Sequence, residues 1–168
     1  MKNIVPYNPT DSAIELVMYG FAVLPLHGIV DGICTCRLGA DCKSAGKHPA
    51  NSNGYKGATT DLVQIRNQFT KMPYANIGIA TGQISNCVVL DIDPRNNGLE
   101  SVDKIKHLLP ETLIARTGSG GLHFYYKYNQ IAKDLYKRLG EGIDVQGDGR
   151  LVVAPPSNHI SGERYEWL

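Results

Sequence analysis

Three aspartates stand where apolar strands are expected to end or to be interrupted. Asp91 and Asp93 close the apolar run CVVLDID at 87–93, and Asp144 is flanked by apolar residues in GIDVQG at 142–147. Because side chains alternate between the faces of a strand, Asp91 and Asp93 share one face, and Asp144 points away from its apolar neighbours. Carboxylates held so close repel each other, and a divalent cation removes that repulsion. Oxygen ligands of this kind favour Mg²⁺ or Mn²⁺, which bind carboxylates together with substrate phosphates.

Each of these acids also has a simpler explanation. Asp93 followed by proline is typical of a turn that leads a strand into solvent, and Asp144 is equally compatible with an edge-strand charge facing water. Taken alone, the Asp-x-Asp pair is a weak signal. A third carboxylate is what a two-metal phosphoryl-transfer site requires, so the three acids together favour a metal site.

A glycine-rich turn offers complementary chemistry. In RTGSGGLHFYYK at 116–127, Ser119, Gly120 and Gly121 can present backbone N–H groups to a phosphate, and His123 begins the next strand. A histidine in this position can donate a hydrogen bond to a phosphate oxygen. The alternative is an ordinary hairpin turn followed by a half-buried histidine.

A second candidate metal site lies in a long loop. Residues 28–57 are rich in Gly, Cys, Lys and Asn and show no clean period, and loops this long are usually functional or held by a metal. The spacing C-x-C-x5-C-x5-H offers a tetrahedral zinc ion four ligands: Cys34, Cys36, Cys42 and His48. The alternative is three free thiols, but zinc is favoured because a segment without a core needs such a link. Cys87 opens a strand and is expected to be a small buried residue.

Composition limits the class of protein. The chain has 168 residues, 42% hydrophobic and 20% charged, which is typical of one globular domain. The formal net charge of +1 gives no indication of a large basic surface for binding nucleic acid, but it is compatible with a local basic groove. No signal peptide and no membrane-length apolar run of about 18 residues is visible, so we expect a cytoplasmic protein with reduced cysteines. The strand-like end RYEWL suggests a piece cut from a longer protein.

The elements that must position these residues follow from periodicity and turn signals. In the first expected helix Ser12 and Glu15 resemble a capping box, and Thr60 or Asp61 is expected to cap the second helix. Helical spacing predicts helices at 10–20, 59–73, 98–110 and 130–140. Apolar runs between turn residues predict strands at 21–26, 75–82, 87–93, 112–118, 122–128, 142–147 and 150–157. The last two strands are expected to pair as a hairpin across a Gly-Asp-Gly turn. The interleaving predicts an α+β or mixed α/β protein in which one sheet carries most of the motifs.

Three segments occur in the order and with the wording of one known family. They are VVLDID at 88–93, RTGSGGLHFYY at 116–126 and GIDVQGDGRLVVAPPSNHISGERYEW at 142–167. The segments YGFAVLPL, GKHPA and ATTDLVQIRNQF…PYANIGIATG look like the family's N-terminal half. From Ala13 to Trp167 the chain resembles the bifunctional DNA primase/polymerase (Prim-Pol) domain of the archaeo-eukaryotic primase superfamily.

The resemblance implies both a fold and a set of roles. The fold would be α+β, a primase-type catalytic core with helices flanking an RRM-like mixed or antiparallel sheet, beside a small N-terminal αβ unit and the zinc-stapled loop. The family's acid-x-acid motif maps onto Asp91 and Asp93, its small residue and histidine onto Ser119 and His123, and its third acid onto Asp144. The acids would hold two Mg²⁺ or Mn²⁺ ions, and His123 would contact the phosphates of the incoming nucleotide.

The implied activity is template-directed nucleotidyl transfer, as a DNA polymerase or primase in DNA replication. Its partners would be a single-stranded DNA template and nucleoside triphosphates. Residues 1–168 would form one catalytic domain at the start of a longer replication protein, followed by parts such as a helicase domain.

Some assignments stay open at this point. Arg116 and Lys47 are candidates for contacts with nucleotide or nucleic acid, and both are equally compatible with ordinary surface cations. Ser157 and His159 either touch nucleotide or cap a loop. Two other functions remain, a non-catalytic module that binds single-stranded nucleic acid and a metal-dependent phosphoesterase that uses the same acids.

Overall fold

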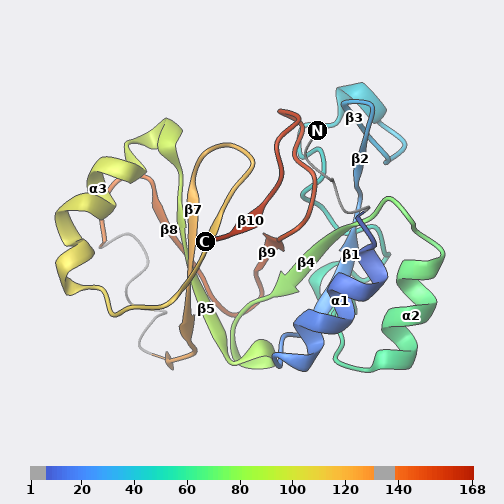
Figure 1. Ribbon diagram of the computed structural model, residues 1–168, viewed down its shortest axis with the longest axis horizontal. Coiled ribbons are helices and arrows are strands. Elements are labelled where there is room, and N and C mark those ends of the chain that lie inside the picture. Colours follow the sequence, from blue (N-terminus) through green and yellow to red (C-terminus); the bar gives the residue numbers. More distant parts are fainter. Residues whose placement is uncertain (1–6, 131–138) are drawn as a thin grey trace.

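The computed structural model describes residues 7–130 and 139–168, and within them the protein is an α+β structure, as predicted. Two antiparallel sheets lie side by side at the centre of the molecule, with helices on their outer sides (Figure 1). The helices are α1 (Pro9–Met18), α2 (Leu62–Thr70) and α3 (Gly98–Ile105). Short 3-10 turns occupy Gly39–Asp41, Gly54–Gly57, Gln83–Ser85, Pro94–Asn96 and Lys106–Leu108. The helix predicted at 130–140 lies almost entirely outside the described residues.

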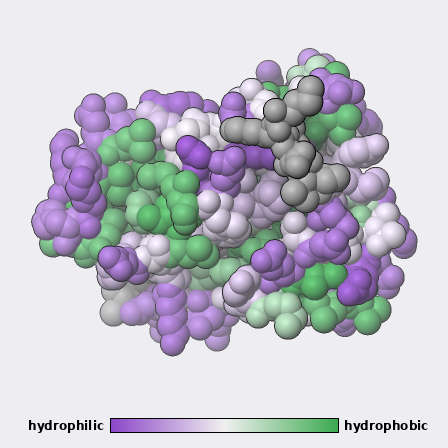
Figure 2. All heavy atoms as spheres, viewed as in Figure 1, coloured by the Kyte–Doolittle hydropathy of each residue, from purple (hydrophilic) through white to green (hydrophobic). Residues whose placement is uncertain are grey.

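The larger sheet has the order β10-β6-β7-β5-β8 and consists of β10 (Glu166–Trp167), β6 (Leu113–Arg116), β7 (Leu122–Lys127), β5 (Cys87–Ile92) and β8 (Ile143–Gln146). One of its faces packs against α3 through an apolar cluster that includes Leu90, Ile92 and Val145. Among the described residues α3 packs against this face, and hydrophobic atoms are visible beside α3 in the left half of Figure 2. The opposite face, which carries Val89 and Tyr125, joins the main core.

The smaller sheet has the order β1-β4-β9 and consists of β1 (Val23–Leu26), β4 (Asn76–Ala80) and β9 (Leu151–Ala154). It packs against α1 and α2 in a core that contains the fully buried side chains of Ile65, Phe69 and Ile77. A separate hairpin, β2 (Ile29–Val30) with β3 (Ile33–Cys34), opens the cysteine-rich loop. None of the described helices is long and apolar enough to cross a bilayer.

The helix starts follow capping chemistry. The second helix begins as predicted, because the Asp61 side chain accepts hydrogen bonds from the amides of Val63 and Gln64. The first helix overlaps the predicted range 10–20, but the capping box predicted from Ser12 and Glu15 is wrong. Helix α1 begins earlier, where Asn8 accepts from the amides that follow Pro9 and the proline occupies the first turn, a position in which its missing N–H costs nothing.

The predicted hairpin of 142–147 with 150–157 is also wrong. Strand β8 pairs with β5 in the larger sheet, whereas β9 pairs with β4 in the smaller one. The Gly-Asp-Gly segment therefore carries the chain from one sheet to the other. Thr81 holds this crossing, because its amide donates to the carbonyl of Arg150 at 3.0 Å and its hydroxyl donates to the carbonyl of Gly147 at 2.7 Å.

Candidate active site and metal-binding loop

A row of polar side chains crosses the larger sheet. Asp91 on β5 lies directly opposite Asp144 on β8 and directly opposite His123 on β7. Directly opposed residues of antiparallel strands lie on the same face, so the three side chains share the face that looks toward the smaller sheet. The His123 ring is almost completely buried, and its Nε2 lies 3.5 Å from Oδ1 of Asp91. Alternation of side chains along each strand therefore placed Asp91 and Asp144 on the correct faces.

A cavity of about 260 Å³ opens over this row. Its wall includes both cations and anions, because Lys47 and Arg95 line it together with the three aspartates. The residues that line it are Lys47, Asp91, Ile92, Asp93, Arg95, Thr117, Ser119, His123, Asp144, Leu151, Val152, Val153 and Tyr165. The structure thus gathers in one place the three predicted acids, Ser119, His123 and Lys47, which are separated by up to 97 positions in the sequence (144 − 47).

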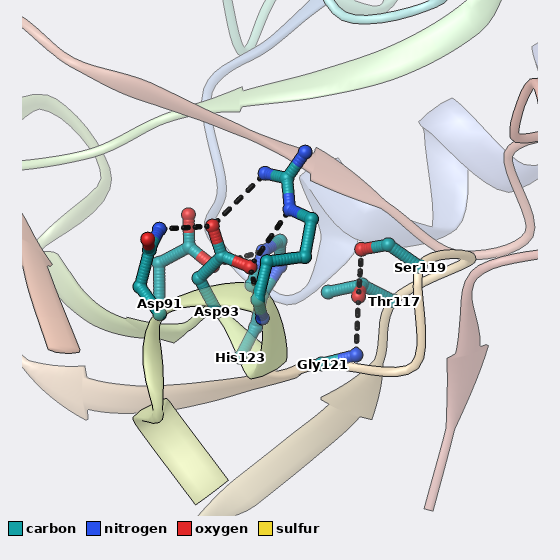
Figure 3. Close-up of polar contacts among 8 residues, drawn as sticks. Asp91, Asp93, Thr117, Ser119, Gly121 and His123 are labelled. Carbon is teal, nitrogen blue, oxygen red and sulfur yellow. Dashed lines mark hydrogen bonds and ion pairs between the residues drawn. The ribbon is translucent and has the colours of Figure 1, made fainter. Parts of the chain in front are cut away.

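Asp93 is held differently from the other two acids. Its carboxylate accepts from the amide, Nε and Nη2 of Arg95 at 3.0, 3.0 and 2.9 Å, and from Nδ2 of Asn96 at 3.0 Å (Figure 3). The side-chain hydrogen bond from Arg95 is the main reason that the pKa of Asp93 lies below its usual range. Arg95 thus supplies positive charge directly to the Asp93 carboxylate.

The glycine-rich turn is closed by its own hydrogen bonds. Gly120 N–H donates to the carbonyl of Thr117 at 2.9 Å. Gly121 N–H donates to Oγ1 of Thr117, also at 2.9 Å (Figure 3). The prediction that these two glycine amides face a phosphate is therefore wrong, because Thr117 already occupies them. What the turn presents to the cavity is the hydroxyl of Ser119, which lies 3.0 Å from Oγ1 of Thr117.

The loop after β9 packs onto this turn. A Cβ atom on Gly118 would lie 2.2 Å from Cβ of His159, so only glycine fits there. Ser161 donates from its hydroxyl to the carbonyl of Gly118 at 2.7 Å and from its amide to Nδ1 of His159 at 3.2 Å. Burial, followed by the charges of Lys47 and Arg95, lowers the pKa of His159. The lowered pKa therefore favours the neutral form of His159 beside Lys47 and Arg95.

Ser157 and Arg116 lie apart from this cavity. The Ser157 hydroxyl accepts from the amide of Ile77 at 2.9 Å, which favours the loop-capping alternative for this residue. Arg116 is exposed on β6 and pairs with Glu166 on the neighbouring strand at 2.6 Å. Among the described residues, the set that lines the cavity does not include Arg116.

Several residues at the site were missed by the sequence analysis. Arg95 and Thr117 adjoin the recognised motifs, so the motif neighbourhood was a usable signal for them. Asn76 had no such signal, because it sits in the strand-like run ANIGIATG. It is fully buried, and its Nδ2 donates to the carbonyls of Gly46 at 2.9 Å and Asn158 at 2.7 Å.

The predicted zinc ligands converge in the structure. The ligand atoms of Cys34, Cys36, Cys42 and His48 all lie within 4.8 Å of one another, and Nε2 of His48 is 3.4 Å from the Cys42 sulfur. Four sulfur and nitrogen atoms at this separation fit a closed tetrahedral zinc site. In the part of the chain that the structure describes, no other group of three or more candidate ligands is this compact, the three aspartates included.

The two kinds of cysteine are electrostatically distinct. Partial burial raises the pKa of Cys36, but hydrogen bonds from the Leu38 backbone and from the other cluster residues outweigh it and bring the pKa to about 6. Burial in β5 raises the pKa of Cys87 to about 12, and this side chain packs in the main core as predicted. Hydrogen bonding in the loop thus favours the thiolate of Cys36, the form that binds metals, whereas burial raises the pKa of Cys42 and the core keeps Cys87 as a neutral thiol.

Comparison with known proteins assigns the chain to a family. A family model described as bifunctional DNA primase/polymerase, N-terminal, matches residues 13–168. A search among curated proteins found no significant match. The family match spans all of the cavity residues and the cysteine cluster, in agreement with the resemblance seen in the motifs. The chain belongs to the Prim-Pol family of bifunctional DNA primase/polymerase N-terminal domains.

Proposed function

We propose that the cavity catalyses template-directed nucleotidyl transfer, the addition of nucleotides to the 3′ end of a primer on a single-stranded DNA template. The observation that carries this proposal is the register that sets Asp144, Asp91 and His123 side by side beneath Lys47 and Arg95. A site for a nucleoside triphosphate needs anions that bind divalent cations and cations that bind phosphate. This cavity has both.

The aspartates fit a pair of Mg²⁺ or Mn²⁺ ions. Asp91 and Asp144 are like charges in directly opposite positions, an arrangement that costs free energy unless a cation lies between them. Asp93 joins them once Arg95 releases its carboxylate. When bound, the two ions would lower the pKa of the attacking 3′-hydroxyl and stabilise the pyrophosphate that leaves.

The neighbouring side chains account for binding of the triphosphate. Lys47, Arg95 and the Ser119 hydroxyl line the cavity and can donate to phosphate oxygens. Nδ1 of His123 is buried and has no hydrogen-bond partner within the described residues, while Nε2 faces Asp91. We assign His123 the role of orienting Asp91 through Nε2 and of contacting the triphosphate when nucleotide fills the cavity.

The cysteine cluster completes the proposal as a structural zinc site. The segment between β3 and His48 contains one short 3-10 turn and few core residues, so a metal link is what fixes its path. The domain would work within a longer replication protein in which a helicase domain follows.

Primer extension tests the proposed function. The protein is incubated with a primed single-stranded template, labelled deoxynucleotides or ribonucleotides, and Mg²⁺ or Mn²⁺. We expect stepwise extension by the wild type, loss of it in Asp91→Asn, and normal extension by Asp103→Asn, which removes an exposed acid on α3. Extension that survives Asp91→Asn would refute the proposal. Template binding without extension would favour a binding module, and release of phosphate or nucleotide without chain growth would favour a phosphoesterase.

A further inference from the structure

Lys47 stands at the junction between the two candidate metal regions. Its side chain lines the cavity with Asp91 and Asp93, and the next residue in the chain is His48, a member of the cysteine cluster. Lys47 is therefore within electrostatic reach of the acids while its backbone belongs to the cysteine-rich loop.

The backbone on either side of Lys47 is held by different means. On the C-terminal side, the His48 carbonyl accepts from the amide of His27 at 3.0 Å, and Ala50 donates to the Pro25 carbonyl at 3.0 Å, so this stretch follows β1. On the N-terminal side, residues 35–46 lie beyond the two-residue strands β2 and β3. The cluster links Cys34, Cys36 and Cys42 to His48 across this stretch.

The side chain of Asn76 holds the backbone on the N-terminal side of Lys47. Its Nδ2 donates to the carbonyl of Gly46, which directly precedes Lys47, and also to the carbonyl of Asn158. Its Oδ1 accepts from the amide of Asn158 at 2.9 Å. Gly46 has a φ of +74°, and a Cβ on it would lie 2.9 Å from Nδ2 of Asn76, so glycine is required for this close approach.

One buried amide therefore joins two loops that reach the cavity. One loop carries Lys47 and the cluster ligand His48, and the other carries His159, which packs against Gly118 of the glycine-rich turn. A change in the path of residues 42–48 alters the position of Gly46 and hence the contact with Asn76. The cluster lies at one end of this chain of contacts and the phosphate-facing residues at the other.

We propose that metal binding at the Cys34–Cys36–Cys42–His48 cluster positions Lys47 for the nucleotide triphosphate, with Asn76 as the residue that transmits this order to the 158–161 loop. The inference rests on the proposed function, in which the cavity binds a triphosphate. Under this proposal, zinc bound at the cluster would raise the affinity for nucleotide as well as link the loop. Lys47 is a binding residue, and Asn76 is a positioning residue that touches no substrate.

Nucleotide binding with and without zinc tests the role of Lys47. Affinity for a deoxynucleoside triphosphate is measured calorimetrically with Ca²⁺, for the zinc-loaded protein and for protein stripped of zinc and returned to the same buffer. One charge-assisted contact contributes about 1.5–3 kcal/mol, so zinc removal should weaken binding about tenfold or more in the wild type. The loss should be about the same in Lys43→Ala, an exposed control on the same loop, and less than about twofold in Lys47→Ala. Unchanged affinity of the zinc-free wild type, or a full loss that persists in Lys47→Ala, would overturn the proposal.

Amide hydrogen exchange tests the role of Asn76 without any nucleotide. Zinc removal should speed exchange at residues 44–48 and also at Asn158, whose amide donates to Asn76. In Asn76→Asp, which keeps the acceptor oxygen but loses both donated bonds, exchange at Asn158 should no longer respond to zinc. Faster exchange confined to residues 44–48 in the wild type would refute the link through Asn76. If the zinc-loaded wild type binds no triphosphate at all, the proposed function fails, while the exchange result still decides whether the two loops are coupled.

Discussion

Replacing Asp144 by asparagine should stabilise the metal-free protein and should strongly slow primer extension when metal is present. Asp144 and Asp91 are directly opposite across the β5–β8 ladder, with Cα atoms about 4.5–5.5 Å apart in such pairs. Like charges in this position are destabilising, and cross-strand pairs of this kind contribute about 0.2–1 kcal/mol. The Asp91 side chain is 36% exposed and Asp144 is exposed, so solvent screening limits their repulsion to about this range.

The size of the effect sets the assay. For a protein of 168 residues, about 1 kcal/mol shifts the melting temperature by about 2–4 °C. Asp144→Asn should therefore melt about 1–3 °C above the wild type in chelator at low ionic strength. The difference should shrink at about 1 M salt, where exposed charges are screened over about 3 Å. In primer extension the same variant should lose at least about a hundredfold in rate, because the bound ions contribute several kcal/mol to the transition state.

Metal and a matched variant complete this test. Adding Mn²⁺ should raise the melting temperature of the wild type more than that of Asp144→Asn, because an ion that binds only the folded state stabilises it. Glu111→Gln changes the net charge equally at an exposed position before β6, and it should leave both melting temperature and activity unchanged. If Asp144→Asn proves less stable than the wild type in chelator and low salt, the idea that the carboxylates repel each other in the folded protein is refuted.

Other outcomes follow from the cavity and the core. In Arg95→Ala the pKa of Asp93 should rise toward its ordinary value, which carboxyl NMR titration measures. In the wild type the Asp93–Arg95 contact stabilises the folded protein at pH values above the ordinary carboxyl pKa, and this stabilisation is lost as the pH falls through the lowered pKa of Asp93. An unchanged Asp93 titration in the variant would contradict the assignment. Gly118→Ala should cost about 1–3 kcal/mol of stability, because the new methyl meets His159, while Gly147→Ala, whose methyl meets nothing within 4 Å, should be close to neutral in the same denaturation assay. Phe69→Ala should cost about 3–5 kcal/mol in urea unfolding, and equal losses from an alanine at the exposed Val63 of the same helix would argue against the core as described.

Local rules accounted for much of the candidate site. Alternation along a strand placed Asp144 opposite to its buried neighbours, as the structure has it, because the pleat repeats every two residues whatever the strand pairs with. The spacing of three cysteines and a histidine indicated a metal site, and their ligand atoms converge because the segment is short. The cap at Asp61 depends only on the next few amides.

Predictions that depended on distant partners were less successful. The turn at 147–150 has the residues of a hairpin, but the strands on either side find better partners in two different sheets. The glycine-rich turn has the composition of a phosphate-binding loop, but the amides of Gly120 and Gly121 donate to the carbonyl and hydroxyl oxygens of Thr117. In both cases the local signal was compatible with two structures, and contacts with residues far along the chain selected one.

The sequence by itself determined which residues are candidates for the chemistry, because residue type, alternation and motif order are local and survive any arrangement of the strands. It indicated three aspartates, a serine and a histidine near glycines, and a cluster of metal ligands. Only the tertiary structure decided that Asp91 and Asp144 face each other, that Lys47 enters their cavity while Arg116 turns to Glu166, and that Asn76 joins the two loops. These relations depend on strand order and register, which are set by burial and hydrogen bonding across the whole chain.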